Sequence, residues 1–301
     1  MTPHPIPAPR IDGFTTTTPV PLYWREDGPA DSSPIVLLHG GPGAHHDYLY
    51  PQLLALAESH RVITYDQRGG GRSKTDDQTP ITWETQVADL AMVMDEFALT
   101  SPVLIGYSWG ALLAMLYCIE ASKQTGDGAM VSLPMPSQLI LISPAPVTRE
   151  WRNEFETALL ERQRSPVIKA MRAELAASGL RERDLEAYRQ RSFELSVAGY
   201  FADPHRASAL TPFRVTGRVQ QSVWESLGDF DLRESLRTLA RAVGLPVLVV
   251  HGRADPIPLE SAMAVAEALD ATFVELRDCG HVPYVEQPAA LFGAMARFVP
   301  T

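Results

Sequence analysis

The sequence from residue 102 to residue 120 reads PVLIGYSWGALLAMLYCIE. Its first part is a short apolar run rich in branched residues, which predicts a buried strand. From residue 110 onward nearly every face is apolar, as in a helix buried against a sheet. Ser108 stands between the two in the pattern Gly-x-Ser-x-Gly, whose small residues let a strand turn at once into a helix. The pattern therefore predicts a hydroxyl presented at the carboxyl edge of a sheet.

Apolar runs of the same kind recur on both sides of this stretch. They lie at residues 35–38, 61–65, 102–106, 138–142 and 246–250, with a weaker sixth at 272–276 and one or two short early strands expected within 14–24. Continuous apolar strands indicate burial on both faces, as in parallel sheets covered by helices. Helical spacing of apolar residues lies between the strands, at 84–98, 110–120, 261–269 and 289–298. The alternation predicts a doubly wound, mostly parallel α/β fold.

The segment 146–234 breaks this alternation. It holds no convincing apolar strand, but charged amphipathic helices, with Trp151, Phe155 and Leu159 at four-residue spacing. We expect it to be a helical cap inserted into an α/β core made of residues 1–145 and 235–301.

Composition limits the partners and the compartment. The chain is 45% hydrophobic and 21% charged, which is ordinary for a globular protein, and its net charge of −10 argues against nucleic acid or anionic membranes as main partners. No apolar run has the length of a membrane helix. The two cysteines cannot form a disulfide framework, and MTPHPIPAPR at the start lacks the features of a secretion signal. We expect a cytoplasmic protein of undetermined oligomeric state.

Two further residues lie where the chemistry of Ser108 needs them. A nucleophilic serine needs a base, and the base needs an orienting acid. Asp255 follows the strand at 246–250, and His281 follows the weaker strand at 272–276. Both loops belong to the sheet edge that carries Ser108, so we expect a catalytic triad of Ser108, Asp255 and His281.

Neighbouring polar residues are weaker candidates. Asp278 is an alternative acid, but three residues before His281 it is typical of a turn. His251 belongs to a strand end and is expected to be structural. The pair at residues 45–46 has no carboxylate or thiol at ligand spacing, so no metal is expected. Cys279 is expected to be a small buried residue rather than a nucleophile.

The loop HGGPG at residues 39–43 follows the strand at 35–38. Its glycines let backbone N–H groups approach a substrate oxygen, as an oxyanion hole requires. The expected donors are the backbone N–H groups of Gly41 and of Trp109, the residue after the nucleophile.

Taken together, these motifs resemble the α/β-hydrolase superfamily and, within it, the proline iminopeptidase family of serine peptidases. The likeness spans about residues 34–120 and 245–300 and lies in HGGPG at 39–43, DQRGGGRS at 66–73, SWG at 108–110 and GH-x-P-x-x-E-x-P at 280–288. Tyr107 departs from it, because the family usually has glycine there. The resemblance implies the triad named above and a helical cap over the site.

The resemblance also implies how substrate is bound. Iminopeptidases hold the free amino group with acidic side chains, mostly from the cap. Glu150 and Glu154 are the first expected acids because they open the first cap helix, and the segment offers two others, Glu225 and Asp229. Trp151, Phe155 and Trp224 are expected to form the walls of an apolar cleft.

The implied activity is release of N-terminal proline or small residues from peptides or amides, without a cofactor. A carboxylesterase acting on small esters would use the same machinery with a different pocket. A non-catalytic ligand receptor on the same fold is a further alternative, although it would not need an intact triad and oxyanion loop.

Overall fold

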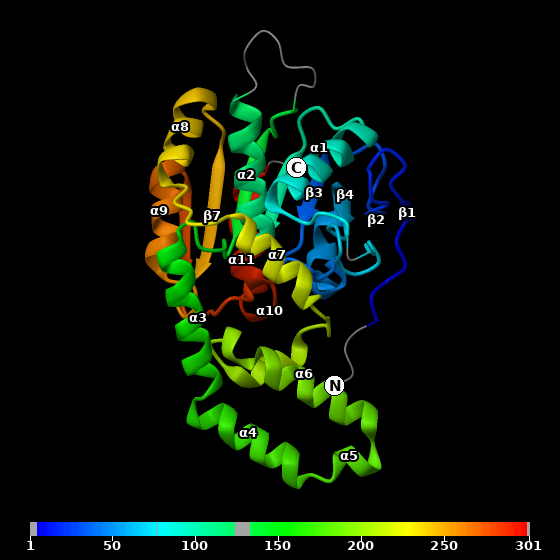
Figure 1. Cartoon of the computed structure of the whole chain (residues 1–301), viewed down its shortest axis with the longest axis vertical. Helices are drawn as coiled ribbons and strands as arrows, with labels where there is room; N and C mark the ends of the chain where they lie inside the picture. Colours follow the sequence, from blue (N-terminus) through cyan, green and yellow to red (C-terminus); the bar gives the residue numbers. More distant parts are fainter. Residues whose placement is uncertain (1–4, 77, 124–132, 300–301) are drawn as a thin grey trace.

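The computed structural model describes residues 5–76, 78–123 and 133–299. Its centre is an eight-stranded sheet in the order β1-β2-β4-β3-β5-β6-β7-β8 (Figure 1). The bounds are β1 Ile11–Phe14, β2 Tyr23–Asp27, β3 Pro34–Leu38, β4 Arg61–Tyr65, β5 Val103–Tyr107, β6 Gln138–Ile142, β7 Val247–Gly252 and β8 Thr272–Leu276. From β4 to β8 every neighbouring pair is parallel, whereas β1 and β2 run antiparallel to their neighbours. The expected α/β-hydrolase sheet is confirmed.

The two early strands were expected within residues 14–24, but β1 and β2 lie mostly on either side of that stretch. They flank a turn in which the Thr15 hydroxyl hydrogen-bonds the Thr18 hydroxyl and accepts the Leu22 N–H at 2.8 Å. Threonine hydroxyls that bond nearby backbone groups favour turns over strands, and this moves the strands to either side.

Both faces of the sheet are buried, which explains the continuous apolar runs. Alternate residues of one strand enter two different cores: Val36 and Leu38 of β3 pack on one face, Ile35 and Leu37 on the other. The first face is covered by α1 (Trp83–Glu96), α2 (Trp109–Lys123), α8 (Arg233–Val243) and α9 (Leu259–Leu269). The second is covered by η2 (Gln52–Glu58), α10 (Pro283–Glu286) and α11 (Pro288–Phe298).

The described residues of the inserted segment, 146–234, form helices and turns. They are α3 (Arg149–Gln163), α4 (Pro166–Ala177), α5 (Leu180–Arg183), α6 (Leu185–Val197), η3 (Ala198–Tyr200), η4 (Pro204–Ala209) and α7 (Gly217–Ser226). Backbone bonds between Arg149 and Phe230 and between Leu232 and Val147, each 2.9 Å, join its two ends. In Figure 1, α4, α5 and α6 project from the sheet as a separate layer, while α7 lies back against the core.

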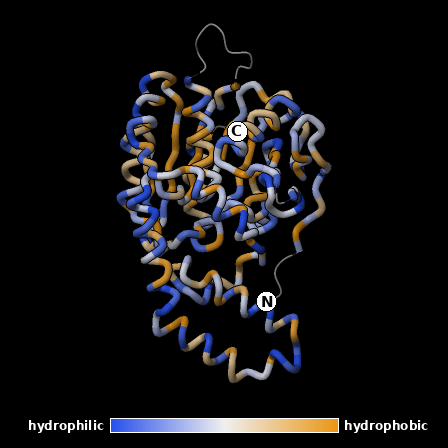
Figure 2. Tube along the Cα trace, in the orientation of Figure 1, coloured by the Kyte–Doolittle hydropathy of each residue, from blue (hydrophilic) through white to orange (hydrophobic). Residues whose placement is uncertain are grey.

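Hydropathy separates the two parts. Figure 2 shows hydrophobic colour concentrated along the inner strands and α2, and alternating colours along α4 and α6. These two helices pack on each other through Ile168, Met171 and Leu195, so each has one apolar face. None of the helices in the described ranges is long and apolar enough to cross a membrane.

Candidate active site

Ser108 occupies a strained turn between β5 and α2. Its φ is +53°, in the left-handed region that residues with a side chain rarely adopt. Glycines on both sides make room, because a Cβ at Gly106 would lie 2.4 Å from the Gly110 carbonyl oxygen and one at Gly110 would lie 2.3 Å from that of Leu38. The backbone packing thus forces the serine hydroxyl outward at the carboxyl edge of the sheet.

Two loops from the same edge bring a histidine and an aspartate to this hydroxyl. His281 Nε2 lies 3.0 Å from Ser108 Oγ, and His281 Nδ1 lies 2.8 Å from Asp255 Oδ2. The Asp255 carboxylate also accepts the Ile257 N–H at 2.8 Å. Burial alone would raise the pKa of Asp255, but the facing imidazoles of His281 and His251 and the two hydrogen bonds together lower it. Asp255 is therefore a buried carboxylate, able to orient an imidazole.

The histidine is held from the inserted segment. The His281 N–H donates to the Tyr200 carbonyl at 2.7 Å, and the imidazole lies between the rings of Tyr107 and Tyr200, with centroids 5.2 and 5.3 Å away. The Glu286 carboxylate accepts the Gly280 N–H at 2.8 Å and the Ala202 N–H at 2.7 Å. Glu286 thus ties the histidine loop to the segment that follows η3.

The expected oxyanion donors flank Ser108. Trp109 is the first residue of α2, so its N–H has no carbonyl one turn earlier in the helix, and the helix N-terminus favours negative charge. Gly41 has φ +55°, and the preceding Gly40 N–H donates to Tyr48 Oη at 2.6 Å. Both expected donors lie beside the nucleophile in the wall of one cavity.

The DQRGGGRS loop supports this glycine loop. His39 Nδ1 hydrogen-bonds the Gly40 carbonyl at 2.9 Å, and His39 Nε2 accepts the Gln67 N–H at 3.0 Å. The Gln67 side chain in turn accepts the indole N–H of Trp109 at 3.0 Å. A single glutamine therefore connects both halves of the expected oxyanion hole.

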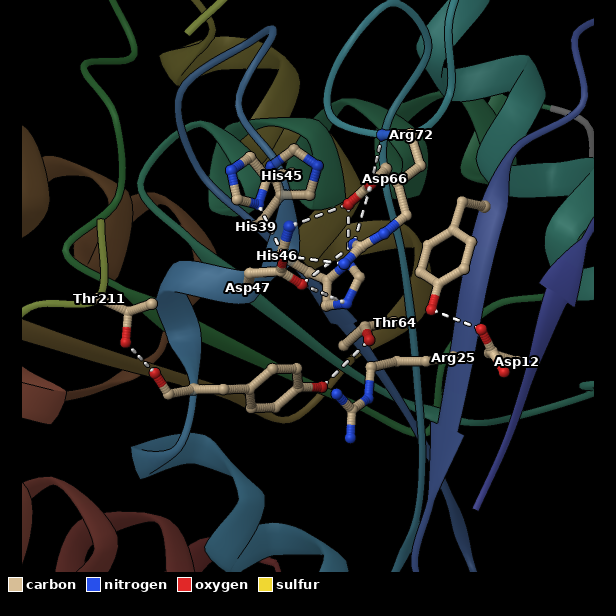
Figure 3. Close-up of polar contacts among 12 residues, drawn as sticks. Asp12, Arg25, His39, His45, His46, Asp47, Thr64, Asp66, Arg72 and Thr211 are labelled. Carbon is tan, nitrogen blue, oxygen red and sulfur yellow. Dashed lines mark hydrogen bonds and ion pairs between the residues drawn. The ribbon is translucent and has the colours of Figure 1, made fainter. Parts of the chain in front are cut away.

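A charged cluster extends the same support (Figure 3). His46 Nδ1 lies 2.7 Å from Asp66, and Arg72 pairs with Asp47 at 3.0 Å. Burial would raise the pKa of Asp66, but the bond and charge of His46 lower it to about 2. Across the described ranges no three His, Cys, Asp or Glu side chains are grouped to hold a metal ion.

A cavity of about 490 Å³ opens over Ser108. The helix α3 lines it with Arg152, Phe155, Glu156 and Leu159, which is the i, i+3, i+4, i+7 stripe of a single helix face. The other aromatic residues around the cavity are Tyr48, Tyr107, Trp109, Phe193, Tyr200, Phe213, Trp224 and Tyr284. Such a mainly apolar cavity beside Ser108 suits a small ligand.

The family model described as the alpha/beta hydrolase family matches residues 35–294. The chain belongs to this family. Among curated relatives, the proline iminopeptidase of Lactobacillus crispatus is 42% identical over 102 residues, 33% of this chain and 35% of that protein. The proline iminopeptidase of Lactobacillus delbrueckii subsp. bulgaricus is 26% identical over 280 residues, 89% of this chain and 90% of that protein. The chain thus spans about a third of the first relative and most of the second.

Solved structures agree on the fold of this chain. The proline iminopeptidase-related protein from Thermus thermophilus matches with a TM-score of 0.70 at 22% identity, covering 96% of this chain and 98% of that one. The proline iminopeptidase of Mycobacterium smegmatis matches with a TM-score of 0.66 at 20% identity, covering 96% and 97%.

The residues expected to bind substrate divide into two groups. Phe155 and Trp224 line the cavity. Glu150 and Glu154 are exposed, and Trp151 packs beneath the Arg233 guanidinium at 5.4 Å, so none of these three reaches the cavity wall. The reason is helical phase, since successive residues turn by about 100° and the cavity faces the stripe that starts at residue 152.

Several residues at the site were not found from the sequence. Tyr48 and Tyr200 belong to two short 3-10 helices, η1 (His46–Leu49) and η3, whose positions no motif fixes. Arg152 and Glu156 stand four residues apart, and this spacing is common on solvent-exposed helices. The one available signal was the apolar residue Phe155 on the same helix face, beside both charges.

His39 makes the stability of this chain sensitive to acid. Burial lowers the pKa of His39 to about 4, and its Nε2 must stay unprotonated to accept the Gln67 N–H. Histidine in an unfolded chain titrates near ~6.5, so between the two values the unfolded state binds more protons. Above pH ~6.5 the neutral His39 therefore contributes on the order of 3 kcal/mol to the free energy of unfolding. This contribution is lost as pH falls toward 4.

Urea unfolding at pH 7 and pH 4.5 measures this effect. We expect His39→Gln to flatten the pH dependence, whereas the exposed His205→Gln should keep it. An equally steep dependence in the His39 variant would assign the acid sensitivity to other groups.

Proposed function

We propose that this chain is a serine hydrolase that acts through an acyl-enzyme. In this scheme His281 takes the proton of Ser108 as the serine oxygen bonds to the substrate carbonyl carbon, and Asp255 holds the imidazole. The oxyanion is stabilised by the N–H groups of Gly41 and Trp109. His281 then protonates the leaving group as its bond to carbon breaks, and water hydrolyses the ester. The continuous 3.0 and 2.8 Å contacts from Ser108 through His281 to Asp255 carry this proposal.

We further propose that residues 146–234 form a cap that selects the substrate, and that the activity is proline iminopeptidase-like. The names of the relatives support this, and so does Glu156, the carboxylate that α3 directs at the cavity. A protonated amine is costly to bury unpaired, so Glu156 is its proposed partner in place of Glu150 and Glu154. The aromatic walls suit a ring-sized side chain such as proline.

A comparison of two substrates tests the amine preference. We expect prolyl amides with a free amine to be cleaved about 10- to 100-fold faster than their N-acetyl forms, the range of a hydrogen-bonded charge pair. Glu156→Gln should remove most of this difference. Glu154→Gln should keep it, because Glu154 lies two residues earlier on α3, about 200° around the helix and away from the cavity. Equal rates on both amides in the parent chain would count against an iminopeptidase.

A carboxylesterase is a second candidate because Glu156 already has a partner. The Arg152 guanidinium lies 2.5 Å from the Glu156 carboxylate, so the charges in the cavity wall cancel. Activity confined to 4-nitrophenyl esters would favour this candidate. A non-catalytic receptor would hydrolyse neither class.

A further inference from the structure

Arg152 is a buried cation in the wall of the catalytic cavity. Its side chain is 14% exposed and its guanidinium lies 4.1 Å from the ring centroid of Trp224 and 5.4 Å from that of Phe155. These two rings fix the guanidinium plane while its stem packs along the helix. Burial lowers the pKa of Arg152, but an arginine stays charged at neutral pH. The structure thus holds a guanidinium in a fixed position in the cavity wall.

The partner of this cation is loosely held. Glu156 is 56% exposed, and among the described cavity-lining residues it is the one carboxylate. The Glu156 carboxylate is hydrated on its exposed side, so it can exchange Arg152 for water at little cost to itself, provided that another anion takes its place on the guanidinium. A buried guanidinium left without an anion is far less favourable, and a ligand carboxylate would relieve it with two parallel N–H···O bonds.

We propose that Arg152 binds a carboxylate on the substrate's leaving group, so that zwitterionic dipeptides are the preferred substrate class. The amine half of this inference rests on the proposed iminopeptidase function, whereas the carboxylate half does not. Side chains one helical turn apart have Cβ atoms about 5–6 Å apart, and an extended dipeptide spans at most about 7 Å. The spacing of Arg152 and Glu156 therefore matches the two ends of one dipeptide, and both side chains line the cavity that holds Ser108.

Binding of a zwitterionic dipeptide keeps the cavity electrically neutral. In the free protein Arg152 and Glu156 neutralise each other. When the dipeptide binds, its carboxylate pairs with Arg152 and its ammonium with Glu156, so no uncompensated charge is buried. A substrate with only one charged end would leave one side chain of the pair without a counter-ion.

Four compounds test each end separately: prolylglycine, prolylglycinamide and the N-acetyl form of each. We expect kcat/KM for prolylglycine to exceed that for the amide by about 10- to 100-fold, as for a hydrogen bond between charged groups. Arg152→Gln should bring this ratio close to one, and Arg152→Lys should restore part of it, because an ammonium lacks the planar fork. Arg149→Gln is the matched control on α3, since the Arg149 guanidinium bonds the Gly228 carbonyl instead, and it should keep the ratio.

The outcomes separate this inference from the proposed function. If acetylation is without effect but the carboxylate still accelerates cleavage through Arg152, the carboxylate half of the inference stands, and its amine half fails together with the iminopeptidase proposal. Equal kcat/KM for acid and amide in the parent chain would overturn the inference. A preference for a carboxylate on the acyl side alone would also overturn it. The comparison of 4-nitrophenyl monosuccinate with 4-nitrophenyl butyrate measures that preference.

Glu156→Gln gives a second variant should Arg152→Gln not fold. It leaves Arg152 without its internal partner, so the preference for the carboxylate should rise above that of the parent chain. An unchanged or smaller preference would contradict the inference.

Discussion

Ser108→Ala is expected to lower kcat by about 10³- to 10⁶-fold, the range found when a member of a catalytic triad is removed. The hydroxyl lies 3.0 Å from His281 Nε2, and alanine leaves the imidazole with no proton to take. KM should change little, because the cavity walls do not depend on this hydroxyl. Steady-state rates on the fastest-cleaved substrate, prolyl amide or 4-nitrophenyl ester, measure the loss.

A fluorophosphonate probe provides the independent check. It should label the parent chain at Ser108 and leave Ser108→Ala unlabelled. Ser222→Ala is a suitable control, since the Ser222 hydroxyl donates to the Ile81 carbonyl at 2.7 Å on α7, and this variant should keep both rate and labelling. Labelling of another serine, or full turnover in the Ser108 variant, would contradict the serine mechanism. Urea unfolding should show that both variants fold.

The sequence predicts the sheet and the edge of the sheet that carries the candidate triad, because both depend on local patterns. A strand buried on two faces must be apolar at every position, and residues that follow parallel strands must meet at one edge. The candidate triad needs only these two facts, since Ser108, Asp255 and His281 each follow a different strand. The two early strands lie away from their predicted position because the hydroxyl of Thr15 forms hydrogen bonds within the turn between them.

The cavity wall was less predictable because it depends on contacts between distant segments. The position of Arg152 depends on Trp224, which α7 brings back against it from 72 residues further along the chain. An arginine and a glutamate four residues apart usually form a solvated pair, and nothing local distinguishes this one. The phase of α3 was therefore undetermined, and with it the difference between Glu154 and Glu156.

Asp255→Asn is expected to lower kcat by about 10⁴-fold while the fold is retained. The carboxylate accepts the His281 Nδ1–H at 2.8 Å, which leaves Nε2 free to take the proton of Ser108. An asparagine can turn its amide N–H toward Nδ1, and this places the imidazole proton on Nε2, where it cannot act as a base. The loss should therefore be in kcat rather than in substrate binding.

Asp278→Asn is the matched control, because Asp278 was the alternative acid. Its side chain is exposed and its φ is +52°, a backbone conformation that asparagine tolerates, so the variant should keep nearly full activity. The Asp255 carboxylate also lies 3.8 Å from His251 Nδ1 at the end of β7, so the substitution of Asp255 also changes the contacts of that strand end. Urea unfolding curves distinguish a loss of stability from a loss of catalysis. Full activity in Asp255→Asn together with loss in Asp278→Asn would reverse the assignment. Partial loss in both would mean that His281 is oriented from two sides, which the buried 2.8 Å contact with Asp255 argues against.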